Sequence, residues 1–286
     1  MDIQIDKLSK SYGYQKAVDA ISFRVKTGEI LGFLGPNGAG KTTTMKMITG
    51  YLDMDEGEIR IGDRSIKNGG LKKHIGYLPE HNPLYEDMPV IDYLHFCAAL
   101  QEMSPAEIPA KIREMVRLCG LDIEKHKRIR ELSKGYRQRV GLAQAMIHDP
   151  EILILDEPTS GLDPNQIVEI RELIKKLGRE KTVILSTHIL PEVEATCDRI
   201  LIINRGRIVA DGSADTLRRQ AQGQQVLHLR IEDAPPDEVF SALRQLPSVG
   251  MVDFLDRDTG RFEVQSTEDK RSNREVFQLC VQRNWV

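Results

Sequence analysis

Three short segments of this 286-residue sequence combine residue types that act on phosphate groups. Residues 35–42 read GPNGAGKT and fit the pattern G-x-x-x-x-G-K-S/T, in which backbone N–H groups, a lysine and a hydroxyl surround phosphate oxygens. Residues 132–139 read LSKGYRQR and place a serine and a glycine at a predicted helix start. Residues 152–157 form an apolar run that ends in two carboxylates. Together the segments predict nucleotide chemistry.

The glycine-rich segment predicts a phosphate-binding loop. Glycines let backbone N–H groups approach the β-phosphate closely, and the start of the following helix favours an anion. Lys41 would contact the β- and γ-phosphates and the Thr42 hydroxyl would contact Mg²⁺. The alternative, a glycine-rich turn with an exposed lysine, is disfavoured by the apolar run before it and the helix-compatible residues after it. The predicted nucleotide-binding residues are Gly35, Pro36, Asn37, Gly38, Ala39, Gly40, Lys41, Thr42 and Thr43.

Two carboxylates follow the apolar run at 152–155. Asp156 is expected at the carboxyl edge of a parallel sheet, where it could hold Mg²⁺ directly or through water. Glu157 points elsewhere and suits a group that orients or activates an attacking water. Such a pair is often only a strand end that meets solvent. The phosphate loop and the following turn, PTSGLD at 158–163, favour the catalytic interpretation.

One histidine has a setting that suits chemistry. His188 follows the predicted strand 182–185, and a histidine at the tip of a sheet strand can reach a γ-phosphate with one ring nitrogen. A lone histidine at a strand end is more often structural, but its place after Asp156 favours function here. The remaining histidines are predicted to be ordinary residues: His74, His81, His95, His126, His148 and His228.

Residues 132–139 can be explained in two ways that are compatible. They predict a helix start with Ser133 as N-cap and with Arg137, Gln138 and Arg139 on the solvated face. A capped helix start at which Gly135 exposes its backbone also suits a γ-phosphate presented by another subunit.

The elements that must position these residues alternate between strands and helices. The predicted buried strands are 30–34, 75–78, 152–155, 182–186 and 200–203. A predicted helix at 164–178 separates two of them, so the expected fold class is α/β with a parallel sheet. Alternating apolar residues at 3–8 and 21–25 predict an antiparallel pair of strands, and residues 90–147 have a helical pattern.

Length and composition predict one large domain and a small one. The polar stretch 218–225 is the expected linker, with a boundary near residue 222. Residues 223–286 suggest a small α+β accessory domain in the order β-α-β-β-α. The apolar ending at 284–286 resembles the start of another strand, so the natural chain is expected to continue.

Net charge, apolar runs and cysteine spacing exclude some classes of function. With 40 basic and 43 acidic residues the net charge is −3, so no nucleic-acid partner is expected. No apolar run approaches the roughly 20 residues that span a bilayer, and the start does not look like a signal peptide, so any membrane role would require a partner. The four cysteines are widely spaced and are expected to be reduced.

The order of the three segments resembles the nucleotide-binding subunits of ABC transporters. The resemblance covers residues 1–222 and implies a P-loop NTPase of the ABC type, with an antiparallel β subdomain and a helical subdomain at about 90–147. It implies ATP hydrolysis with Lys41, Glu157 and His188 as catalytic residues and with Thr42, Asp156 and Glu80 at Mg²⁺. Asp163 would belong to the D-loop, which contacts the partner's site. The signature residues that would act on the partner's ATP are Ser133, Lys134, Gly135, Tyr136 and Gln138.

The signature segment, Tyr12 and Glu80 need separate comparison with the family. The commonest signature has Gly and Gln where this chain has Lys134 and Tyr136-Arg137, with Gln138 one place later, but Ser133 and Gly135 are kept. Tyr12 resembles the aromatic that stacks on adenine, with Tyr14 as a rival and a structural turn tyrosine as the alternative. Glu80 stands where the family usually has a glutamine. It could bind the metal more tightly, repel the phosphates, or point to solvent.

The resemblance implies that the chain is the ATPase subunit of a membrane transporter. TTTM at 42–45 and PEHNP at 79–83 are similar to exporters of the ABC-2 type, and among them to the gliding-motility-associated kind. The implied partners are a transmembrane permease and a second ATPase subunit, identical or paralogous, on the cytoplasmic face of the membrane. Two alternatives remain: a non-transport ABC ATPase that acts on ribosomes or DNA, and a P-loop small-molecule kinase.

Overall fold

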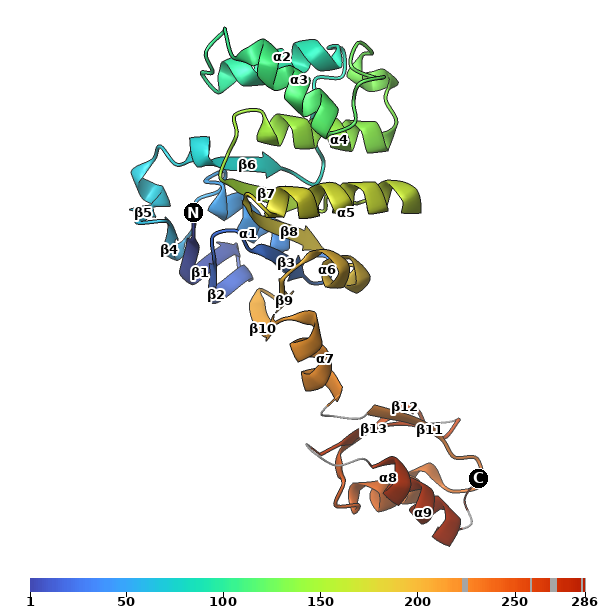
Figure 1. Cartoon of the computed structure of the whole chain (residues 1–286). Coiled ribbons are helices and arrows are strands. Elements are labelled where there is room, and N and C mark those ends of the chain that lie inside the picture. The colour runs from blue at the N-terminus through green and yellow to red at the C-terminus, as the bar shows by residue number, and fades with distance from the viewer. Residues whose placement is uncertain (223–225, 258, 268–271, 284, 286) are drawn as a thin grey trace. The chain divides into compact units, whose positions relative to one another are not determined.

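The computed structural model of the protein describes residues 1–222, 226–257, 259–267, 272–283 and 285. Contacts within the chain divide it into two units, Met1–Ala214 and Asp215–Val286. Among the described residues, the first unit has two sheets and the second has one (Figure 1). Each unit has its own apolar core.

A six-stranded sheet forms the centre of the first unit and has the order β10-β9-β3-β8-β7-β6. Its strands are β3 (Ile30–Leu34), β6 (Ile75–Leu78), β7 (Ile152–Asp156), β8 (Thr182–Thr187), β9 (Arg199–Asn204) and β10 (Arg207–Gly212). All neighbours are parallel except β10, which pairs antiparallel with β9. The predicted parallel sheet is confirmed. Because parallel strands point the same way, the loops that follow β3, β6, β7 and β8 leave the sheet at one edge.

An antiparallel sheet and a helix cover one face of this central sheet. The strands are β1 (Ile3–Tyr12), β2 (Gln15–Val25), β4 (Glu56–Ile61) and β5 (Arg64–Ser65), in the order β2-β1-β4-β5. The predicted antiparallel pair is confirmed. Their inward side chains share one buried cluster with α1 (Lys41–Ile48) and with alternate residues of the central strands, and Phe23 packs on Phe33 at 5.6 Å between ring centroids. Each large side chain buried here contributes about 1.5–3 kcal/mol.

Helices contact the opposite face of the central sheet. They are α5 (Pro164–Gly178) and α6 (Leu190–Thr196), which contact β8 and β3 respectively. Gly32 allows α6 to approach β3 closely, because a Cβ at this position would lie 2.8 Å from side-chain atoms of Val193 and Cys197. The sheet is therefore covered on both sides, which explains why its strands are continuous apolar runs.

Helices dominate the stretch between β6 and β7. They are α2 (Val90–Leu100), α3 (Ile108–Leu118) and α4 (Lys134–Met146), with a short 3-10 turn at Ile129–Glu131 before α4. Two further 3-10 turns, Ile66–Asn68 and Lys72–His74, precede β6. α4 contacts α2, α3 and β6, and Tyr93 of α2 donates to the Gln144 side chain of α4 at 2.8 Å. The helical pattern expected for this stretch is confirmed, and its separate status as a subdomain remains a prediction.

The second unit is a small α+β fold. Its elements are β11 (Val226–Arg230), α8 (Pro236–Arg244), β12 (Val249–Asp256), β13 (Arg261–Ser266) and α9 (Asn273–Arg283), and its antiparallel sheet has the order β11-β13-β12. This order of elements agrees with the prediction. Its core includes Val239, Phe262 and Val264.

The join between the two units differs from the expected linker. α7 (Ala214–Gln222) covers the first part of the stretch 218–225, and residues 223–225 lie outside the described part of the chain. The chain is therefore helical, not an irregular linker, at least as far as Gln222. The boundary near residue 222 remains a prediction, and residues 284 and 286 of the apolar ending also lie outside the described part.

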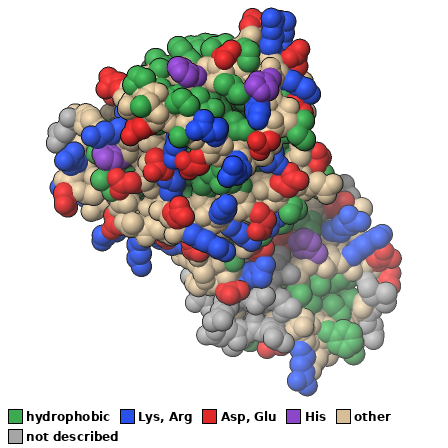
Figure 2. Space-filling model, turned by 45° about the horizontal axis from the view of Figure 1, so that its top comes forward, with side chains coloured by type: hydrophobic (Ala, Val, Ile, Leu, Met, Phe, Trp, Pro, Cys, Tyr) green, Lys and Arg blue, Asp and Glu red, His purple; other side chains and the backbone are tan. Residues whose placement is uncertain are grey.

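The surface is mixed in charge. Figure 2 shows acidic and basic side chains interspersed on the face that it presents. None of the helices within the described residues combines the length and the apolar character that crossing a membrane would require. All four cysteines are free thiols, and burial raises the pKa of Cys97 to about 11 and that of Cys119 to about 12.

Candidate active site

The phosphate loop joins the end of β3 to the start of α1. Gly40 has a φ of 108°, and a Cβ at this position would lie 2.4 Å from the Ala17 carbonyl oxygen, so only glycine fits. Gly40 also precedes α1 without a side-chain cap, which leaves N–H groups of the first turn to an outside acceptor. The loop therefore builds a helix start that suits an anion.

Lys41, the first residue of α1, is buried and holds its ammonium group over the loop. Its Nζ donates to the carbonyl oxygens of Gly35 at 2.7 Å and Pro36 at 3.2 Å. The same Nζ lies 3.5 Å from Oε1 of Glu157. A phosphate that enters the loop would meet this fixed positive charge.

A cavity of about 310 Å³ opens beside the loop. Its lining residues are Tyr12, Gln15, Ala17, Asn37, Gly38, Gly40, Lys41, Thr42, Thr43, Glu80 and Glu157. Tyr12 is therefore next to the phosphate loop, whereas Tyr14 is fully exposed and is not among the lining residues. All the sequence-predicted nucleotide residues except Gly35, Pro36 and Ala39 line this cavity. Gly35 and Ala39 are buried, and Pro36 is exposed.

Asp156 ends β7 as predicted and is completely buried. Its Oδ1 accepts a hydrogen bond from the Ser186 hydroxyl of β8 at 2.5 Å. Among the described residues its Oδ2 has no hydrogen-bond partner. A buried carboxylate oxygen without a partner is costly, and a cation or a bound water would satisfy it.

Glu157 links the two neighbouring strand ends. Its backbone has a φ of 50°, an uncommon conformation for a residue with a side chain, and its N–H donates to both the carbonyl and the hydroxyl oxygen of Ser186. Its Oε2 lies 3.0 Å from Nδ1 of His188, and Oε1 faces Lys41. The structure thus brings the three predicted catalytic residues together.

Burial has the largest effect on the pKa of both carboxylates, Asp156 and Glu157. It raises the pKa of Asp156 above its ordinary value, against the opposing effect of the nearby Ser186 and Thr42 hydroxyls. It also raises the pKa of Glu157, although the charges of Lys41 and His188 act in the other direction. A raised pKa suits a group that must accept a proton near neutrality.

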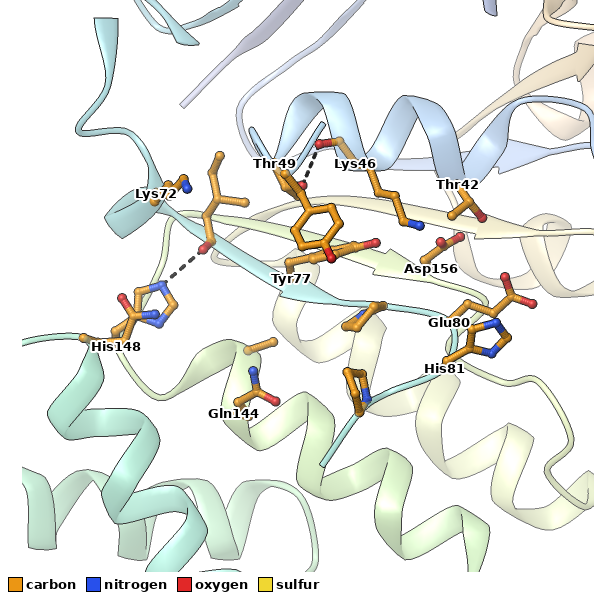
Figure 3. A pocket seen from close by; sticks show the side chains of 16 residues that line it. Thr42, Lys46, Thr49, Lys72, Tyr77, Glu80, His81, Gln144, His148 and Asp156 are labelled. Carbon is orange, nitrogen blue, oxygen red and sulfur yellow. Dashed lines mark hydrogen bonds between the residues drawn. The ribbon is translucent and has the colours of Figure 1, made fainter. Parts of the chain in front are cut away.

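The donor set fits a divalent metal that is shared with a phosphate. Thr42, Asp156 and Glu80 lie at the same end of a second cavity, of about 530 Å³ (Figure 3). In the described residues no group of three or more His, Cys, Asp or Glu side chains could hold a metal alone. A hydroxyl and two carboxylates leave coordination positions for phosphate and water oxygens, as Mg²⁺ prefers. The free Oδ2 of Asp156 fits this arrangement.

The signature segment begins α4, with Ser133 as the N-cap. The Ser133 hydroxyl accepts from the Tyr136 N–H at 3.4 Å, so the predicted cap is present. The expectation that Gly135 exposes its backbone is wrong for this chain alone. Gly135 is buried, and the side-chain end of Gln166 lies over it, 2.5 Å from the place a Cβ would take.

Gln138 was predicted on the solvated face of α4, and that prediction is also wrong. Gln138 is only 5% exposed. It lies one helical turn from Gly135 and from Leu142, both buried, so it shares the face that packs on the rest of the unit. Arg137 and Arg139 are half-buried, and Arg139 pairs with Glu169.

The D-loop after Glu157 lies against the signature segment of the same chain. Asp163 caps α5 by accepting from the Gln166 N–H at 3.0 Å. The Lys134 ammonium lies so close to Gly161 that a Cβ there would be 2.0 Å from its Nζ. None of the described signature residues lines the cavity beside the phosphate loop. Within the described residues of one chain, the signature segment therefore does not meet the cavity beside the phosphate loop.

Sequence comparison identifies the family. Residues 18–160 match the family described as ABC transporter. An uncharacterised ABC transporter ATP-binding protein of Bacillus subtilis, YxlF, is 34% identical over 282 residues, which cover 98% of this chain and 92% of that protein. This chain belongs to the ABC transporter ATP-binding family.

Further similarity places this ABC ATPase among transport proteins. The Nod factor export ATP-binding protein I of Paraburkholderia xenovorans is 37% identical over 230 residues, 79% of this chain and 76% of that protein. A solved ATP-binding subunit of an ABC transporter is 32% identical, with a TM-score of 0.70 over 78% of this chain and 94% of its own. The fold class is confirmed, and the chain is an ATP-binding, ATP-hydrolysing subunit of the ABC transporter family.

Sequence reasoning missed two polar residues of this ABC ATPase, one at the site and one that contacts α4. Ser186 holds both Asp156 and Glu157, and Asn82 donates to the Arg137 carbonyl oxygen of α4 at 2.8 Å. The position of Ser186 at the end of a buried strand, next to a residue of interest, was an available signal. Nothing in the sequence indicated that Asn82 and α4 are in contact, because 55 positions separate Asn82 from Arg137.

Proposed function

We propose that this chain is the motor subunit of an ABC exporter, in which two ATPase subunits close on Mg²⁺ and ATP and drive a separate transmembrane permease. The similarity to the Nod factor export protein supports the export direction. The TTTM and PEHNP segments support the ABC-2 type and, within it, a gliding-motility-associated protein. The subunit would lie peripherally on the cytoplasmic face of the membrane.

One observation carries the proposal of a paired site. The phosphate loop, Lys41 and Glu157 line one cavity, whereas Ser133 and Gly135 are absent from its lining among the described residues. A helix start with a serine cap is an anion site that its own chain does not use. A second copy, identical or paralogous, would supply it to the γ-phosphate.

The proposed chemistry divides among the residues that the structure brings together. Lys41 binds the β- and γ-phosphates, and Glu157 orients the attacking water and accepts its proton. His188 gives Nδ1 to Glu157, so its Nε2 is left for the γ-phosphate. When bound, Mg²⁺ neutralises charge that develops on the phosphate oxygens. The residues proposed to hold it are Thr42, Asp156 and Glu80, and Tyr12 is proposed to stack on adenine.

The test is the oligomeric state of the full chain with a Glu157→Gln substitution, measured by light scattering. With ATP and Mg²⁺ the variant is expected to form a dimer, because it binds ATP but cannot complete hydrolysis. With ADP it is expected to stay a monomer. A Glu157→Gln chain that remains monomeric with ATP contradicts the paired site.

Copurification separates the transporter from its alternatives. Recovery of the tagged chain with a polytopic membrane protein supports export or import, whereas recovery with ribosomes supports a switch function. A small-molecule kinase would copurify with neither a membrane protein nor ribosomes, and it would form no ATP-dependent dimer.

Glu80 offers a narrower prediction about the metal. It is exposed at the junction of both cavities, near Thr42 and Asp156. Glu80→Gln is expected to raise the Mg²⁺ concentration needed for half-maximal ATPase activity about threefold to tenfold, because one charged ligand becomes neutral. A Mg²⁺ titration checks this. An unchanged titration curve together with unchanged transport would mean that Glu80 does not serve the metal.

A further inference from the structure

A buried carboxylate outside the nucleotide cavity joins the two loops that carry Glu157 and His188. Glu192, in α6, is only 6% exposed. One of its oxygens, Oε2, accepts from the Thr159 hydroxyl at 2.8 Å and from the Thr187 hydroxyl at 2.8 Å. Thr159 belongs to the D-loop after β7, and Thr187 is the last residue of β8.

The Thr187 hydroxyl also fixes the backbone on both sides of His188. Its oxygen accepts from the Ile189 N–H at 3.1 Å while its hydrogen is donated to Glu192. His188 therefore lies within a short turn that the Thr187 hydroxyl closes. The Glu192 carboxylate holds this hydroxyl in place. On the other strand, Thr159 lies two residues after Glu157, within a turn closed by the hydrogen bond from the Ser160 N–H to the Glu157 carbonyl oxygen.

A carboxyl group is an expensive choice for this buried position. Within the described residues no cation pairs with Glu192, and its Oε1 has no hydrogen-bond partner. Burial of a carboxyl group is unfavourable unless hydrogen bonds replace those it made to water. The two hydroxyl donors meet on one Glu192 oxygen and so join the two loops at a single point.

We propose that Glu192 is a positioning residue for ATP hydrolysis, which holds the His188 ring against Glu157. The proposal rests on the proposed roles of Glu157 and His188 and extends them to a residue that touches neither nucleotide nor metal. The contact that Glu192 maintains is the one between Nδ1 of His188 and Oε2 of Glu157, at 3.0 Å. Without this anchor both loops keep their strands but lose their fixed spacing.

The experiment compares the full-length variants Glu192→Gln, Thr187→Val and Thr159→Val with a matched control, Thr196→Val. Thr196 lies in the same helix and is also buried, but its hydroxyl has no hydrogen-bond partner among the described residues. Steady-state ATPase kinetics give kcat and the KM for ATP. Nitrogen NMR of histidine-labelled protein without nucleotide reports the state of the His188 ring, assigned with His188→Gln.

Glu192→Gln and Thr187→Val are expected to lower kcat about tenfold, with KM changed less than about twofold, because a misplaced catalytic group slows chemistry more than binding. The signal of His188 Nδ1 is expected to shift toward that of a ring nitrogen without its hydrogen bond to Glu157. Thr159→Val is expected to lower kcat by a smaller factor, and Thr196→Val to leave kinetics and signals unchanged. If Glu192→Gln does not fold, Thr187→Val, which keeps shape and volume, carries the test.

Three outcomes overturn the proposal: an unchanged kcat in Glu192→Gln, a lowered kcat with unchanged His188 signals, or an equal loss in Thr196→Val. The NMR measurement needs no ATP, so it tests Glu192 even if the proposed roles at the site are wrong. Those roles fail separately if His188→Gln or Glu157→Gln hydrolyses ATP at the wild-type rate.

Discussion

A Gly135→Asp chain and a Lys41→Ala chain are each expected to lose ATP hydrolysis, by about a hundredfold or more, and to regain it when the two are mixed. In a mixed dimer, Lys41 of the first chain would face the intact Gly135 of the second. Half of the dimers would be mixed and each would have one intact site, so recovery is expected up to about a quarter of the wild-type rate. ATPase activity against mixing ratio measures it.

Both substitutions suit this test because neither should unfold the chain. Gly135 lies in the first turn of α4, where an aspartate is compatible with the helix dipole, and the atom that it would meet is the movable end of Gln166. The new carboxylate would repel a partner's γ-phosphate. Lys41→Ala removes the only side chain whose ammonium contacts the loop carbonyls of Gly35 and Pro36 among the described residues.

Lys175→Ala is the matched control for the lysine change, because Lys175 is a half-buried residue of α5 that pairs only with Glu172 among the described residues. It should neither lose activity nor need complementation. Full activity of the Gly135→Asp chain alone would show that one chain completes its own site. Mixtures that stay as inactive as their components would exclude exchange of these two groups between subunits.

Asp156→Asn is expected to have opposite effects on activity and stability. Hydrolysis should fall about a hundredfold or more, since the proposed metal loses a charged ligand. The free energy of unfolding of the nucleotide-free and metal-free protein should increase by about 1 kcal/mol or more, because the buried carboxylate loses its charge. This corresponds to a melting temperature higher by about 2–4 °C. Calorimetry and ATPase assays measure the two effects.

The pH dependence fixes the sign of this stability effect. Because burial raises the pKa of Asp156, the folded chain keeps a proton that the unfolded chain has released. The associated stability is complete below the ordinary value of 3.8 and is lost as pH rises through the higher pKa of the folded state. The asparagine variant has no such loss, so its advantage should appear at neutral pH and vanish in acid. An advantage that grows toward low pH would contradict this account.

Much of the fold was predictable because short segments of sequence determine its strands and its phosphate loop. The central strands are apolar runs covered on both faces, so burial alone reveals them, and the glycine-rich loop has a pattern that few other structures require. Asp156, Glu157 and His188 could be grouped because parallel strands end at one edge. The type of each residue and its position at the end of a predicted strand were enough to place these three side chains at one edge of the sheet.

The parts that could not be predicted depend on contacts between distant positions. Gln138 looked like a solvated residue because glutamine is polar, but its helix face packs inward next to Gly135. Gln166 covers Gly135 from another helix, and Glu192 meets Thr159 across 33 positions. No local pattern records such pairs, since each residue type is ordinary in its own segment.

The separation of the phosphate loop from the signature segment has a consequence for local unfolding. Lys41 and Asp156 are anchored in α1 and β7, which belong to the buried layers of the central sheet, whereas Ser133 begins a helix of the stretch between β6 and β7. Cooperative opening of that helical stretch alone would leave the loop able to hold a nucleotide. In the proposed dimer, the opened chain would still bind its own ATP but would no longer place Ser133 at the ATP of its partner. Hydrolysis would then be lost at the partner's phosphate loop.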